Sequence, residues 1–96
     1  MGLNGKQRRK LRALGHHLEP VVMVGQSGGT EGVIAATEQA LEDHELIKVK
    51  VGEGPEDRHE AADRLAEATK SEVAQVLGRT VLLFRKRKED SKFDDL

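Results

Sequence analysis

Four glycines fall within the eight residues GQSGGTEG, at positions 25–32, where an apolar segment gives way to an amphipathic one. Because glycine lacks a Cβ, such a backbone can approach a ligand closely or turn sharply. Three roles fit this composition: a turn that presents a serine nucleophile, a cradle for phosphate, or a tight turn that binds nothing. The residues around the glycines must distinguish these roles.

Residues 25–29 match G-x-S-x-G, the motif that places a nucleophilic serine between a strand and a helix. Asp43 and His59 could complete a triad with Ser27. However, the expected helix cap, Thr30, lies three residues beyond that serine, and a chain of 96 residues is small for a triad with its oxyanion loop and substrate pocket. The phosphate-binding P-loop needs a lysine that the segment lacks, and G-x-G-x-x-G is not present. We therefore expect neither an enzyme nor a cofactor.

The remaining motif is G-x-x-G, formed by Gly25, Gln26, Ser27 and Gly28. Free N–H groups near the start of a helix favour an anion. KH-type RNA-binding modules clamp the nucleotide backbone with such a loop. The motif is short, so a turn without a ligand remains an alternative.

Basic residues are concentrated at two places in a chain whose formal net charge is only -1. Residues 1–12 and residues 79–88 each carry five bases and no acid, whereas residues 13–78 hold five bases and thirteen acids. Segregated charge can build a basic face, and basic faces attract phosphate backbones. We expect the loop to share one face with Arg8, Arg9, Lys10 and Arg12, and with Lys48 or Arg85.

The glycines are expected to join a strand to a helix. The strand, residues 21–24, is apolar on both faces, so we expect it to lie in the middle of a sheet. Thr30 is the expected N-cap of the helix. The buried side of that helix is predicted to carry Val33, Ile34, Thr37 and Leu41.

A first helix precedes this unit. Asn4 and Gln7 predict a capping box, and Gly15 predicts a stop after the last turn. The leucines of this helix, at spacings of three and four, are expected to face a core: Leu11, Leu14 and Leu18.

Three further segments complete the pattern αβαβαββ. Residues 46–51 alternate between apolar side chains and Lys48 and Lys50, which predicts a half-buried strand with a basic outer side. Residues 54–56 resemble the start of a third helix. Residues 73–77 and 80–85 then predict two strands joined by a two-residue turn. We expect one domain over residues 1–88 and a disordered acidic tail over residues 89–96.

Composition narrows the function further. Phe84 and Phe93 are the only aromatic residues, so a row of aromatics that stacks bases is excluded, and recognition would depend on backbone and shape. The chain has no cysteine, and its histidines do not suggest a zinc site. No apolar run reaches the ~18–20 residues of a membrane span. We expect a cytoplasmic protein with no metal, no membrane partner and no small-molecule substrate.

The stretch from Leu11 through Val51 closely resembles CRM domains, named for chloroplast RNA splicing and ribosome maturation, and above all the single-domain bacterial YhbY-like proteins. The resemblance is carried by the Gly15-His16 pair, by the G-x-x-G loop followed by TEG, and by HELIKVKV from His44. It continues more loosely to VLGRTVLLFR.

This resemblance implies a helix before a βαβαββ core with a four-stranded mixed sheet, similar to the C-terminal domain of translation initiation factor three. It also implies RNA binding and association with precursors of the large ribosomal subunit. The family often has a base in or before the loop, where this chain has Gln26 and Glu19, so we expect the outer basic residues to supply more of the affinity. The implied RNA-binding residues are Gly25, Gln26, Ser27 and Gly28, supported by Lys6, Arg8, Arg9, Lys10, Arg12, Lys48 and Lys50. The second basic cluster adds Arg85 to the expected RNA-binding residues.

A different class of function remains open. The acidic helices could bind a basic partner, such as a ribosomal protein, and the chain would then be a protein–protein adaptor. This alternative gains weight if the two basic clusters lie on opposite sides of the molecule.

Overall fold

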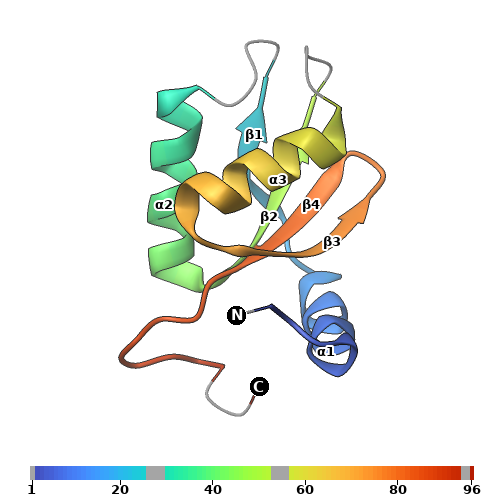
Figure 1. The fold of residues 1–96 in the computed structure, drawn as a ribbon, viewed down its shortest axis with the longest axis vertical. Helices are drawn as coiled ribbons and strands as arrows, with labels where there is room; N and C mark the ends of the chain where they lie inside the picture. The colour runs from blue at the N-terminus through green and yellow to red at the C-terminus, as the bar shows by residue number, and fades with distance from the viewer. Residues whose placement is uncertain (1, 26–29, 53–56, 94–95) are drawn as a thin grey trace.

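The computed structural model describes residues 2–25, 30–52, 57–93 and 96, and its elements follow the order αβαβαββ (Figure 1). The elements are α1 (Gly5–Gly15), β1 (Pro20–Val24), α2 (Glu31–His44), β2 (Leu46–Val51), α3 (Arg58–Thr69), β3 (Glu72–Leu77) and β4 (Thr80–Phe84). The strands form one sheet in the order β1-β2-β4-β3. β1 runs parallel to β2, whereas the β2–β4 and β4–β3 pairs are antiparallel. The predicted α/β fold with a four-stranded mixed sheet is confirmed.

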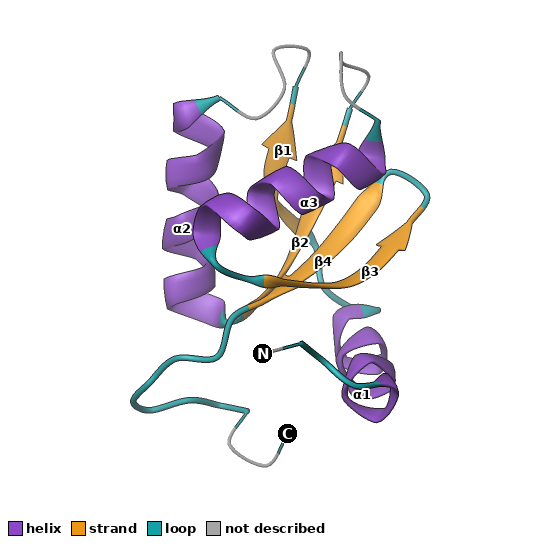
Figure 2. Cartoon of the chain, viewed as in Figure 1, coloured by secondary structure: helices purple, strands orange, loops and turns teal. Residues whose placement is uncertain are grey.

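The sheet buries both faces, but to different extents. α2 and α3 lie on one face, and α1 packs at one end of the other (Figure 2). The alternation predicted for β2 is confirmed, because Ile47, Val49 and Val51 all belong to the core under α2 and α3. A smaller cluster on the opposite face joins Leu11 of α1 to Leu46, Ala74, Leu82 and Phe84.

Each helix begins at a side chain that accepts a hydrogen bond from the backbone of the first turn. The Asn4–Gln7 capping box is present, with its two hydrogen bonds at 2.8 and 2.9 Å. Thr30 caps α2 as predicted, and accepts from the N–H three residues later at 3.3 Å. α3 is capped by Asp57, while the start expected at residues 54–56 lies outside the described residues. Each such cap stabilises its helix by ~0.5–2 kcal/mol.

The prediction that residues 21–24 form a central strand is wrong. β1 is the first strand of the sheet and therefore an edge strand. Val21 and Met23 are 53% and 59% exposed, because α1 packs against β2 and β3 and does not cover their side of β1. The apolar character of both strand faces therefore reflects an exposed apolar surface, not a second buried one.

The expected ending of α1 also differs from the structure. Gly15 is not a stop beyond the helix but its last residue, and it is buried against β4. A Cβ at this position would lie 2.6 Å from a methyl carbon of Leu82, so any other residue would require the buried Leu82 side chain or α1 to move. Of the three leucines expected to face a core, only Leu11 does so, whereas Leu14 and Leu18 are 47% and 36% exposed.

Glu45 joins the end of α2 to the segment that follows β4. It has a φ of 65° and no exposed surface. Its carboxylate accepts hydrogen bonds from the Ser91 hydroxyl at 2.5 Å and from the backbone N–H groups of Lys92 at 2.7 Å and Arg87 at 2.9 Å. Burial by itself would raise the pKa of Glu45, but these hydrogen bonds and the charge of Arg87 outweigh that effect and lower the pKa below its ordinary value.

The expected disordered tail covers residues 89–96, of which the structure describes 89–93 and 96. Ser91 and Lys92 lie against Glu45. Phe93 packs edge-to-face on Phe84, with ring centroids 5.1 Å apart. These contacts hold this part of the tail beside the cluster that contains α1.

Candidate nucleic-acid interface

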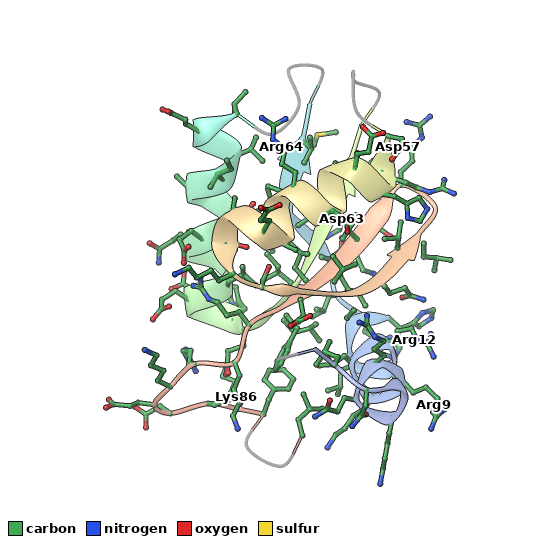
Figure 3. The ribbon with its side chains drawn as sticks, viewed as in Figure 1. Arg9, Arg12, Asp57, Asp63, Arg64 and Lys86 are labelled. Atoms are coloured by element: carbon green, nitrogen blue, oxygen red, sulfur yellow. The ribbon has the colours of Figure 1, made fainter. Side chains whose placement is uncertain are left out.

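α1 presents a basic outer surface. Leu11 and Gly15 occupy the side that packs on the sheet, so most of the charged side chains of the helix face solvent, and Figure 3 shows Arg9 pointing away from the sheet. We call the exposed bases Lys6, Arg9, Lys10 and Arg12 the α1 bases. Arg8 differs, because it is partly buried and its guanidinium donates to the carbonyl of Val73 in β3. The main role of Arg8 is therefore to fix α1 against the edge of the sheet.

Lys48 and Lys50 lie on the face of β2 that points away from α2 and α3. In the β1–β2 ladder, Lys50 is paired with Met23, and Lys48 with Pro20. We call the surface formed by Val21, Met23, Lys48 and Lys50 the open sheet face, because no described helix covers it. The sequence predicted that Lys48 and Lys50 would be exposed on this face. It did not predict the exposure of Val21 and Met23, because that exposure follows only when β1 is an edge strand.

Only the first residue of the G-x-x-G loop is described. Gly25 is exposed and follows β1 directly, whereas residues 26–28 lie outside the described residues, so their contact with RNA stays a prediction. Lys50 precedes Val51, which pairs with Val24 at the end of β1, and this base is therefore close to Gly25.

α1 and Gly25 lie at opposite ends of β1 (Figure 1). A strand of five residues, at ~3.3 Å per residue, separates them by about 17 Å. The α1 bases and Gly25 are therefore not in contact, and the prediction that the loop shares a face with α1 stays a prediction for residues 26–28, which are not described. The α1 bases, the open sheet face and Gly25 instead follow one another along β1.

Arg85 and Arg87 of the second basic cluster do not join the first. Arg85 lies on the side of α2 and α3, where its guanidinium donates to the Thr69 carbonyl at 2.8 Å. It also pairs with the carboxylates of Glu38 and Glu42, the latter at 3.3 Å. Arg87 donates to the Glu42 carbonyl at 3.1 Å, on the same side. The donors of Arg85 thus connect α2 to α3, away from the α1 bases with which it was expected to act.

Charge is divided between the two faces of the sheet. α1 contains five bases and no acid. α2 contains four acids and neither lysine nor arginine. Because α1 and α2 pack on opposite faces, the nearly neutral chain has a basic side and an acidic side, which the sequence could not place relative to each other.

The residues considered for catalysis do not form a site in the described part of the chain. Asp43 accepts a hydrogen bond from the Gln39 amide at 3.0 Å within α2, and His59 is exposed at the start of α3. Ser27 is among the residues that are not described. Over residues 2–25, 30–52, 57–93 and 96, no group of three or more His, Asp or Glu residues could hold a metal ion. No helix in these ranges is long and apolar enough to cross a membrane.

Comparison with known proteins identifies relatives over nearly the whole chain. The family model of the CRS1 / YhbY (CRM) domain matches residues 3–85. PA4753 of Pseudomonas aeruginosa, named a "Probable RNA-binding protein", is 41% identical over 93 residues, which cover 96% of this chain and 89% of the relative. YqeI of Bacillus subtilis, named in the same way, is 38% identical over 93 residues, which cover 96% of this chain and 97% of the relative.

A solved structure has the same fold. The solution structure of SAV1595 from Staphylococcus aureus is 40% identical and superposes with a TM-score of 0.80, over 94% of this chain and 95% of that one. The archaeal protein MJ0652 of Methanocaldococcus jannaschii is 46% identical over 94 residues, which cover 95% of this chain and 69% of the relative.

Proposed function

The chain belongs to the CRS1 / YhbY (CRM) domain family, and on this premise we propose that it binds RNA through the α1 bases and the open sheet face. The names of its bacterial relatives support this function. One observation carries the proposal: the bases of α1, together with Lys48 and Lys50, lie on one face of the sheet, while the acids of α2 lie on the other.

Phosphate contacts would supply most of the affinity. A nucleic-acid duplex carries one negative charge per ~1.7 Å of its axis, so a basic band as long as β1 faces several phosphates at once. Lysine and arginine side chains reach those phosphates without reading the bases, which gives little preference among sequences. Phe84 is buried and Phe93 packs on its edge, so these two rings do not form a stacking row.

The loop at Gly25 would extend this band. We propose that the backbone N–H groups of residues 25–28 contact one further phosphate near the start of α2. The helix dipole places partial positive charge there. Because the loop contains no lysine or arginine, its contribution to the affinity is expected to be smaller than that of the α1 bases.

The RNA is proposed to be ribosomal, within precursors of the large subunit, where the protein would act in the cytoplasm as an assembly factor without enzymatic activity. The resemblance to YhbY-like proteins supports this narrower role. Ultraviolet crosslinking in cells, followed by sequencing of the attached RNA, should recover large-subunit precursors above messenger RNA. Recovery in proportion to RNA abundance would refute this role and leave general RNA binding.

Salt dependence tests the electrostatic mechanism. If the α1 bases, Lys48 and Lys50 each contact a phosphate, log K should fall with log salt with a slope of about -4 to -5. We expect Lys50→Ala to reduce the steepness of this slope by roughly one. Arg58→Ala removes the same charge from the start of α3, on the opposite face, and serves as the matched control with the slope unchanged.

The measurement is fluorescence anisotropy with a structured RNA at several salt concentrations. A slope near zero would contradict phosphate binding. Equal effects of Lys50→Ala and Arg58→Ala would show that only net charge matters, and would refute the assignment of RNA binding to the α1 bases and the open sheet face.

A protein–protein adaptor is the second candidate, and the placement of Arg85 favours it, because this base of the second cluster lies on the acidic side. In this case α2 would bind a basic protein. Charge reversal of the α1 bases would then leave binding of the basic protein unchanged, whereas neutralising Glu31 on α2 would weaken that binding. A pull-down of ribosomal proteins with each variant distinguishes the two functions.

A further inference from the structure

Three exposed apolar residues border a hollow where α1 meets β1. Leu14, Leu18 and Val21 are 47%, 36% and 53% exposed, and they line a hollow of about 430 Å³. Leu46 of β2 and Phe93 of the tail also line it. Beside this hollow, Gly15 at the end of α1 lies against Leu82 of β4, and β1 is an edge strand. Grouped exposed apolar residues of this kind commonly mark a binding site.

The surroundings of this hollow are basic. Lys48 and Lys92 line it, and Glu19 is the one acid among the described residues that do so. Lys10 lies one helical turn before Leu14, so the hollow continues the surface of the α1 bases. An apolar floor with cations beside it suits a flat apolar group that is attached to an anion.

We propose that this hollow binds an unpaired nucleobase of the RNA, with Lys48 and Lys92 on the adjoining phosphates. The proposal rests on the proposed RNA binding and adds a ligand class to it. The volume falls within the ~300–1,000 Å³ usual for small-molecule sites, which accommodates one nucleotide. A base in a duplex is stacked and cannot enter, so the protein should distinguish RNA that contains unpaired nucleotides from a continuous duplex.

Charge complementarity favours RNA over an apolar peptide as the occupant. A peptide strand could cover Val21, but it would not need two lysines beside the apolar floor. A nucleotide uses both features together, and the next residues along α1 already offer phosphate contacts. Binding of a protein segment is therefore treated as an outcome of the test.

The experiment compares two RNAs that share one stem, the first fully paired and the second with a two-nucleotide bulge that contains 2-aminopurine. Wild-type protein should bind the bulged RNA about tenfold more tightly, and its binding should change the 2-aminopurine fluorescence. The variant Leu14→Ser/Leu18→Ser should keep its affinity for the paired stem and lose most of the preference, because both residues line the hollow and neither belongs to the α1 bases or the open sheet face. Leu77→Ser, at an equally exposed apolar position (61%) next to the β3–β4 turn, is the control and should keep the preference. Thermal melting establishes that each variant is folded.

Three results would overturn the proposal while RNA binding stands: equal affinity of the wild type for both RNAs, equal losses on both RNAs in the double variant, or full preference retained by the double variant. The last of these would leave a protein segment as the occupant. If the wild type binds neither RNA, the proposed function fails as well, so the two failures are distinguishable.

Discussion

Replacing Glu45 with glutamine tests whether one buried carboxylate holds the end of α2 and residues 87–92 together. Glutamine keeps the size and one acceptor oxygen, but its NH₂ group would face at least one of the three donors that now bind the carboxylate. A hydrogen bond to a charged group contributes ~1.5–3 kcal/mol, and a buried donor left without a partner costs ~1–3 kcal/mol. We therefore expect Glu45→Gln to lower the free energy of unfolding by roughly 2–4 kcal/mol.

The effect should depend on pH in a defined direction. The pKa of Glu45 is lowered in the folded protein, so its carboxylate stabilises the fold fully above the unfolded pKa of about 4.3. This contribution is lost as the pH falls through the lower, folded pKa. The difference in stability between the wild type and Glu45→Gln should therefore be constant near neutral pH and shrink below about pH 4.

Urea denaturation followed by circular dichroism measures both effects. With m values of ~1–3 kcal/mol/M, the expected loss moves the midpoint by about 1 M or more. Glu42→Gln is the control, because the Glu42 side chain is 66% exposed and pairs with Arg85 at 3.3 Å. That change should cost at most about 0.5 kcal/mol. Equal losses for the two variants, or a difference that does not vary with pH, would refute the role assigned to the buried carboxylate.

Three further changes test other parts of the structure. Gly15→Ala should destabilise the fold by ~1–3 kcal/mol, because the new methyl group would lie 2.6 Å from Leu82. Leu82→Ala should then lower the free energy of unfolding less in the Gly15→Ala protein than in the wild type. Strictly additive losses in urea titrations would show that the two side chains do not clash. Arg85→Ala should lower the free energy of unfolding by ~1–2 kcal/mol in urea titrations, since the Arg85 guanidinium connects α2 to α3. The affinity for RNA, measured by fluorescence anisotropy, should change little. Replacing Gln26 and Ser27 with Asp should leave the melting temperature nearly unchanged but weaken RNA binding about tenfold through repulsion of phosphate; unchanged affinity would reduce the loop to a turn.

Local periodicity and capping residues were sufficient to predict the elements. The alternation in residues 46–51 identified the buried side of β2, because a half-buried strand must place successive side chains on opposite faces. Asn4 and Thr30 marked the starts of two helices, because a side-chain oxygen there satisfies an N–H that the helix cannot. The two basic clusters were also evident, since charge is read directly from residue types.

The neighbours of each element were decided only by the tertiary structure. An apolar strand has the same sequence pattern at the centre of a sheet as at an edge with an open apolar surface. The sequence therefore predicted Val21 and Met23 to be buried, whereas the strand order β1-β2-β4-β3 leaves both exposed. Arg85 was predicted to act with α1, but its guanidinium contacts residues 16 and 47 positions away in the chain. Glu45 appeared to be one acid among many, and its three donors come from residues more than 40 positions later. Periodicity reports which side of an element is apolar, whereas the partner of a charged side chain depends on which segments the completed sheet brings together.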